Sequence, residues 1–170
     1  MENTNNTEIT RALLRHIVAT LAYRASKVLR EVPPGFAEFS ASPSMRRPVQ
    51  IVSHLADLMG WAGRTAQGEM VWKPEGSSDW DTEVRRFFDG LAELDRILTS
   101  DIPINQAAHV LIQGPLADAF THVGQLAMLR GAAGLPVRPE SYARAQIVAG
   151  RVGLDQAPPG REFDGDASAR

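Results

Sequence analysis

Residues 78–99, SDWDTEVRRFFDGLAELDRILT, carry the clearest structural signal in the chain. Apolar side chains recur there every three or four residues, which is the period of an amphipathic helix. They are Trp80, Val84, Phe87, Phe88, Leu91, Leu94 and Leu98. Ser78 or Asp79 can cap the first turn, and an acidic residue is favourable near that end of a helix. The stretch predicts one long helix with a single face in a core.

A similar pattern precedes it at residues 8–30. Apolar residues at spacings of four and seven form its expected inner face: Ile9, Leu13, Ile17, Leu21 and Val28. This register leaves Arg11, Arg15 and Lys27 for solvent. Asn6 or Thr7 can cap the start, and the Pro-Pro-Gly run at 33–35 ends the helix.

Two more long helices are expected. One runs from about Pro48, a good first helical position, to about Gln67. Its inward residues are Val49, Val52, Leu55, Ala56, Met59 and Ala62. The other begins at Gly114-Pro115 and ends before Gly134. Four amphipathic helices predict an all-α four-helix bundle.

The C-terminal residues are expected to contribute little to this bundle. A short extra C-terminal helix is expected at residues 141–150, and residues 151–170 read as an extended tail with little core potential. We therefore expect a single helical bundle domain over residues 1–170, with its core at about 8–150.

Composition excludes several classes of function. The chain has 170 residues, a net charge of -2 and no cysteine. Without Cys there is no disulfide, thiolate zinc site or cysteine nucleophile, so any metal must bind imidazole and carboxylate. The charge argues against a nucleic-acid binder, since such proteins need a basic surface. No signal-like or membrane-spanning stretch is recognisable, so a cytoplasmic location is expected.

Three residues could hold a divalent metal. Asp118 and His122 are four residues apart, so they share one helix face and can both bind one metal ion. Gln125 continues that face, where it could hold a water or the other nitrogen of an imidazole. His54 is mid-helix among apolar neighbours and needs partners for both ring nitrogens. Asp57, three residues on, either accepts a hydrogen bond from the nitrogen that the metal leaves free or points to solvent.

Each of these residues also has a simpler explanation. A single interior His is more often a hydrogen-bonded core residue, and Asp118 near a helix start also suits the helix dipole. His16 is expected at the surface, on a face shared with Tyr23, and His109 in a structural linker. Arg130 is explained as a cation near a helix C-terminus. The three tryptophans, Trp61, Trp72 and Trp80, are most simply core or loop anchors.

Two motifs in this order resemble the DinB/YfiT-like superfamily. The first is HLADLMGW at residues 54–61, and the second is DAFTHVGQLAMLR at 118–130, followed by Gly-Leu-Pro at 134–136. The family pattern has a His in the second helix and a His-x-x-x-His pair in the fourth. His54 and His122 match family ligand positions, whereas Asp118 stands where many members have His. Two His and one carboxylate still form a recognised ligand set.

The resemblance implies an up-down-down-up bundle, commonly homodimeric, with nickel, zinc or a similar divalent metal held by three side chains. Some members are similar to thiol transferases that use a low-molecular-weight thiol, and others to metal-dependent hydrolases. A metal-dependent enzyme with a small-molecule substrate is therefore expected. No general base is obvious, and Asp57 and Tyr23 are the catalytic candidates to test. The alternative is a non-catalytic, stress-associated bundle that binds a partner or small molecule.

Overall fold

The computed structural model describes residues 2–104 and 108–163, and for residues 2–5 the backbone alone. That part of the chain is helical, without a strand, and confirms the expected all-α bundle. The long helices are α1 (Glu2–Leu29), α2 (Pro48–Ala66), α3 (Trp80–Thr99) and α5 (Ala117–Ala132). The shorter elements are η1 (Phe36–Glu38), α4 (Ala108–Leu111), the π-helical η2 (Ile112–Leu116) and η3 (Tyr142–Arg144). None of the described helices combines the length and apolarity needed to cross a bilayer.

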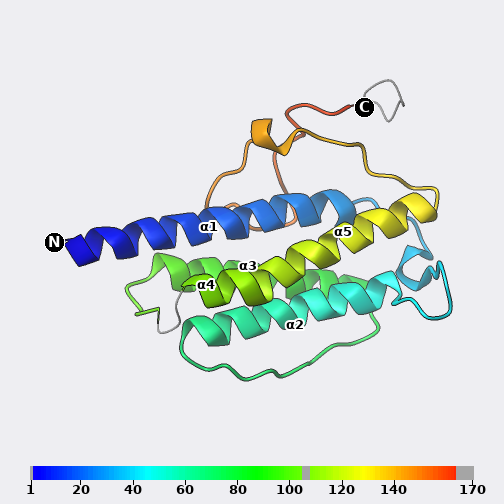
Figure 1. The fold of residues 1–170 in the computed structure, drawn as a ribbon. Coiled ribbons are helices and arrows are strands. Elements are labelled where there is room, and N and C mark those ends of the chain that lie inside the picture. Colours follow the sequence, from blue (N-terminus) through cyan, green and yellow to red (C-terminus); the bar gives the residue numbers. More distant parts are fainter. Residues whose placement is uncertain (1, 105–107, 164–170) are drawn as a thin grey trace.

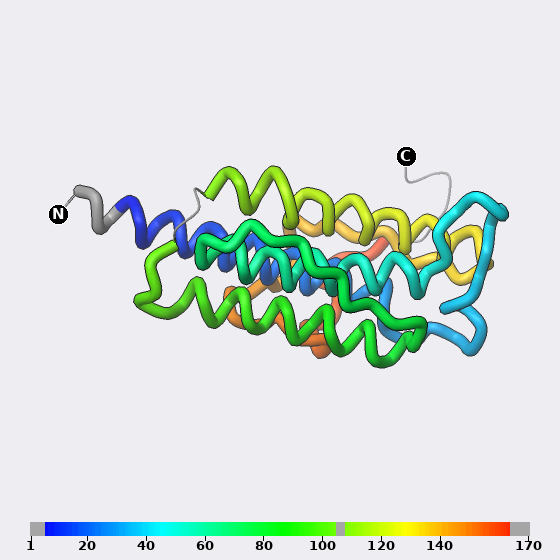
Figure 2. Tube along the Cα trace, turned by 90° about the horizontal axis from the view of Figure 1, so that it is seen from below, coloured from blue at the N-terminus to red at the C-terminus, as the bar shows by residue number. Residues whose placement is uncertain are grey.

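The four long helices lie side by side around one apolar core (Figures 1 and 2). α2 and α3 begin at the same end of the bundle, because residues 67–79 run back along α2 before α3 starts. α3 approaches α2 closely at Gly90, where a Cβ would lie 2.7 Å from that of Met59. The long return segment matters for the site, since it places Trp72 against α2.

Helices α2 and α3 agree with the sequence prediction. The Asp79 carboxylate caps α3 by accepting a hydrogen bond from the Thr82 N–H at 2.8 Å. Pro48 is the first residue of α2. The six residues that were expected to face inward on α2 are all buried. In both helices a capping signal and one unbroken apolar face coincide, which explains the agreement.

Helix α1 differs from its prediction in extent and in register. It starts at Glu2, so Asn6 and Thr7 lie inside the helix and do not cap it. Ile9 and Leu13 were expected inward but are 58% and 56% exposed. Leu21 and Val28 are buried as predicted and Ile17 is half-buried, whereas the other buried positions are Leu14, Val18 and Ala25. Along residues 13–18 the buried positions therefore follow the predicted ones by one residue, and the second half of the helix agrees with the prediction.

The basic residues expected in solvent on α1 turn towards the protein instead. Arg15 pairs with the Asp95 carboxylate of α3 at 2.9 Å. Arg11 donates to backbone carbonyls at the end of α3, including that of Leu98. The Lys27 side chain is only 8% exposed and pairs with two glutamates. These partners are at least 80 residues away in sequence, so helical periodicity could not indicate them.

The fourth helical stretch begins earlier than expected. Ala108–Leu111 is already helical, which places His109 on α4 rather than in a linker. Pro115 is inside the stretch rather than at its start, and a proline there removes a hydrogen bond and clashes with the preceding turn. The chain accommodates it with the π turn η2 and a non-helical Gly114. The predicted C-terminal end of this helix is confirmed, because α5 ends at Ala132 and Gly134 has φ +77°.

The predicted C-terminal helix at 141–150 is wrong, because only the 3-10 turn η3 forms there. The segment instead pairs with residues near 162: Ser141 N–H donates to the Arg161 carbonyl, and Phe163 N–H to that of Pro139. Residues 151–163 also have more core potential than expected, since Val152 and Ala157 are buried. The rest of the expected tail, 164–170, is outside the described residues.

Candidate metal centre

His54 faces α5 from the middle of α2. Its ring lies edge-on to that of His122, with centroids 4.7 Å apart. Trp72 from the 67–79 segment also packs against this ring, with a centroid separation of 5.6 Å. The imidazole therefore contacts both a second imidazole and an indole.

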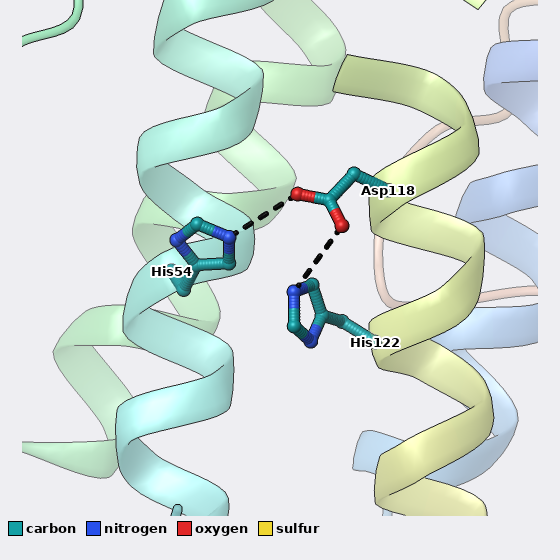
Figure 3. A group of neighbouring side chains, drawn as sticks. All are labelled: His54, Asp118 and His122. Atoms are coloured by element: carbon teal, nitrogen blue, oxygen red, sulfur yellow. Dashed lines mark hydrogen bonds and ion pairs between the residues drawn. The ribbon is translucent and has the colours of Figure 1, made fainter. Parts of the chain in front are cut away.

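Asp118 lies between the two imidazoles. Its Oδ2 is 3.3 Å from Nε2 of His54, and its Oδ1 is 3.4 Å from Nε2 of His122 (Figure 3). Asp118 and His122 are one turn apart on α5, as their spacing predicts. One potential ligand atom from each of the three residues falls within 4.8 Å of the others. The three residues that the sequence singled out are therefore brought together.

The two contacts of Asp118 are made by different oxygens of its carboxylate. A hydrogen bond between charged groups usually measures about 2.7–2.9 Å, so both contacts are long. One oxygen faces each imidazole, so the carboxylate bridges the two rings. A group of two imidazole nitrogens and a carboxylate could hold a divalent metal ion.

Gln125 orients His122 in the way the helical spacing suggested. Its Oε1 is 2.7 Å from Nδ1 of His122. An amide oxygen only accepts, so Nδ1 of His122 carries the proton and donates it. In the neutral ring, the lone pair is then on Nε2, the atom that faces Asp118. The tautomer is thus the one that metal binding through Nε2 requires.

The charge state of His54 is also compatible with a ligand role. Burial lowers its pKa below the usual value for histidine. The hydrogen bond to Asp118 opposes this shift, while His122 and the Arg46 guanidinium add to it. A lowered pKa keeps the imidazole neutral near pH 7, and only a neutral ring offers a lone pair to a metal.

The cluster opens into a cavity of about 500 Å³ between α2 and α5. Its lining is Met45, Arg46, Ile51, His54, Asp118, His122, Gln125, Met128 and Leu129. The Asp118 side chain is 45% exposed and also borders a second cavity, of about 450 Å³, beside Trp61 and η2. The cavity volume falls within the range of small-molecule sites, and the carboxylate can be reached from both sides.

Neither catalytic candidate from the sequence lines the main cavity. Asp57 is buried and accepts hydrogen bonds from Arg86 of α3 and from the Glu75 N–H, so it is not the partner of His54. Tyr23 is buried as well and donates to Glu140 at 2.7 Å. Burial raises the pKa of Tyr23 well above its usual value, and the hydrogen bond adds to this, which disfavours the phenolate. His16, seven positions before Tyr23 on α1, is exposed, which confirms its expected place at the surface.

Several residues have roles that sequence reasoning did not assign. Trp72 contacts both His54 and Trp61, whose ring centroid is 6.0 Å away. Arg130 donates to the carbonyls of Val28 and Arg30, so it joins the ends of α5 and α1. Arg46 lines the main cavity from the loop before α2. Trp72 and Arg46 lie in loops without a periodic pattern, so no sequence signal indicated their contacts. Trp80 is an anchor as expected, packed edge-on against Phe36.

Comparisons of this chain with protein-family models, with curated proteins and with solved structures find no match.

Proposed function

We propose that this protein is a divalent-metal-dependent enzyme that acts on a small molecule. The observation that carries the proposal is the meeting of His54, Asp118 and His122, with ligand atoms within 4.8 Å of one another, at the edge of a 500 Å³ cavity. Three protein ligands leave a coordination position free, which is typical of catalytic rather than structural metal sites.

Each residue of the proposed site would have its own role. His54, Asp118 and His122 hold nickel, zinc or a similar ion, and Gln125 fixes the tautomer of His122. Trp72 packs against the His54 ring and limits its movement. An ion bound there supplies Lewis acidity that lowers the pKa of a water or a thiol. The reaction class is therefore transfer of a low-molecular-weight thiol or hydrolysis of a small substrate.

Membership of the DinB/YfiT-like superfamily is part of this proposal. The two motifs at 54–61 and 118–130 support it, and so do the helix directions in Figure 1, where α1 and α5 run opposite to α2 and α3.

We propose a homodimer as well, as the resemblance implies. The exposed Ile9 and Leu13, one turn apart on α1, offer an apolar surface for it. Sedimentation of the wild type and of Leu13→Glu tests this part.

Metal content is the first test. Protein purified without a His tag and dialysed against Ni²⁺ or Zn²⁺ should contain about one ion per chain by elemental analysis. The variant His122→Ala should lose the ion, whereas His16→Ala, at an exposed position on α1, should retain it. Equal metal content in the wild type and His122→Ala would contradict the proposed site.

Turnover separates the reaction classes. Consumption of an electrophile that requires an added thiol supports thiol transfer, and turnover of an ester or amide without thiol supports hydrolysis. A panel of thiols, electrophiles and esters should show metal-dependent turnover that is lost in His54→Ala. Stoichiometric metal without turnover of any panel member would instead favour a non-catalytic bundle that binds a small molecule.

A further inference from the structure

Arg46 lines the wall of the main cavity from the loop before α2. Within residues 6–104 and 108–163, whose side chains the structure describes, no carboxylate pairs with its guanidinium. Its neighbour Arg47, by contrast, pairs with Glu38 at 2.5 Å. Arg46 and His54 line the same cavity, so a ligand at the candidate metal centre has the guanidinium within the same space.

We propose that the cavity binds a small organic anion and that Arg46 holds its carboxylate or phosphate group. This deepens the proposed function by naming the substrate class, and it rests on that function for the place of the reaction. Arg presents planar, paired N–H donors that match either anionic group.

The charges around the cavity favour an anion. Among its described lining residues, Arg46 is the one permanent cation and Asp118 the one carboxylate. Asp118 is turned towards the two imidazoles rather than to Arg46. A divalent ion at the centre would add two positive charges, so the loaded site would carry a net charge of about +2 if both histidines are neutral. A cationic ligand would be repelled from such a site.

The other side chains that line the main cavity suit the apolar part of a ligand. Met45, Ile51, Met128 and Leu129 line the cavity beside Arg46. Two of the four are methionines, whose flexible thioether side chains adapt to ligands of different shape. A ligand with a short apolar chain and an anionic end would cover these side chains while its charge reaches Arg46.

Calorimetric titrations with matched probes test the proposal. Hexanoate and hexyl phosphate carry the two candidate anions, hexan-1-ol is the neutral control and hexylammonium the cationic one. We expect both anions to bind more tightly than the other two probes, in metal-free and in Zn²⁺-loaded protein. Arg46→Ala should weaken binding of the anions by about five-fold without affecting hexan-1-ol. Arg46→Glu should reverse the order of hexanoate and hexylammonium in metal-free protein.

Arg47→Ala is the matched control, because Arg47 is the adjacent guanidinium but does not line this cavity, and it should leave all four affinities unchanged. An anion preference that survives in Arg46→Ala would overturn the proposal, and so would equal affinities for all four probes. If the protein takes up no metal, the proposed function fails, and the metal-free titrations alone decide the role of Arg46.

Discussion

The Gln125 Oε1 atom lies 2.7 Å from Nδ1 of His122, and this contact decides which nitrogen of the imidazole faces the cluster. The two residues are three positions apart on α5, so the same helix supplies a candidate ligand, Asp118, and the group that orients a second one. The arrangement follows from helical geometry alone, since residues three and four apart share a face.

Removing this acceptor should weaken metal binding. We expect Gln125→Leu to lower the affinity for Zn²⁺ by about 10- to 100-fold, because the ring loses the partner that fixes its tautomer. Gln125→Glu keeps an acceptor oxygen and should retain most of the affinity. Competition titration with a chromogenic chelator measures both. Gln113→Leu, at an exposed glutamine of η2, is the control, and an affinity for Gln125→Leu equal to that of this control would exclude the orienting role.

Metal binding should also be visible in tryptophan fluorescence. Trp72 packs against His54 at a centroid distance of 5.6 Å, so Ni²⁺ at the cluster is close enough to quench it. We expect saturable quenching by Ni²⁺ with the same midpoint as metal uptake. Trp72→Phe should lose most of the quenching, whereas Trp80→Phe should keep it, because Trp80 packs against Phe36 rather than against the cluster. Unchanged quenching in Trp72→Phe would show that the ion binds elsewhere.

The sequence predicted those structural features that depend on residues close together in the chain, such as a helix start or a shared helix face. Pro48 and the Asp79 cap mark the starts of α2 and α3, and the i, i+4 spacing placed Asp118 and His122 on one face. His54 was placed in the same cluster by combining an interior helix position with the family pattern. The helix starts and the Asp118–His122 spacing need only helical periodicity and a capping rule, whereas the placement of His54 needed the resemblance as well.

What the sequence could not supply are contacts made between distant segments. Glu140 bonds both Tyr23 and Lys27, and this holds residues 139–163 across α1 where a fifth helix was expected. Asp57 has the right spacing to serve His54, yet it turns towards Arg86 because α3 packs on that side of α2. Periodicity assigns a face to a residue but does not say which neighbour covers that face.

The cap of α3 should make stability depend on pH in the acid range. Hydrogen bonding by Thr82 lowers the pKa of Asp79 in the folded protein. A carboxyl whose pKa is lowered by folding stabilises the protein fully above its unfolded pKa, and this contribution is lost as the pH falls through the folded pKa. We expect the difference in Tm between the wild type and Asp79→Asn to be present at pH 5–7 and to shrink below about pH 4. A difference that is constant from pH 7 to 2.5 would rule out a charge effect.

Asp57 should contribute to stability rather than to catalysis. Arg86 joins the buried Asp57 to Glu83, which has no exposed side-chain surface. Removing one partner of such a network leaves a buried charge uncompensated, so Arg86→Ala should lower the free energy of unfolding by about 3 kcal/mol in urea denaturation. Arg85→Ala, at the adjacent exposed position, should change it by less than about 0.5 kcal/mol.

The variant Asp57→Asn distinguishes a role of Asp57 in stability from a role in the metal centre. Asp57→Asn removes the charge that faces Arg86 but keeps an oxygen that can accept from the Glu75 N–H. We expect reduced stability with one metal ion still bound per chain, because Asp57 does not line the cavity with His54. Loss of the ion from a variant of wild-type stability would place Asp57 in the metal centre after all. Elemental analysis and urea denaturation of the same preparation distinguish these outcomes.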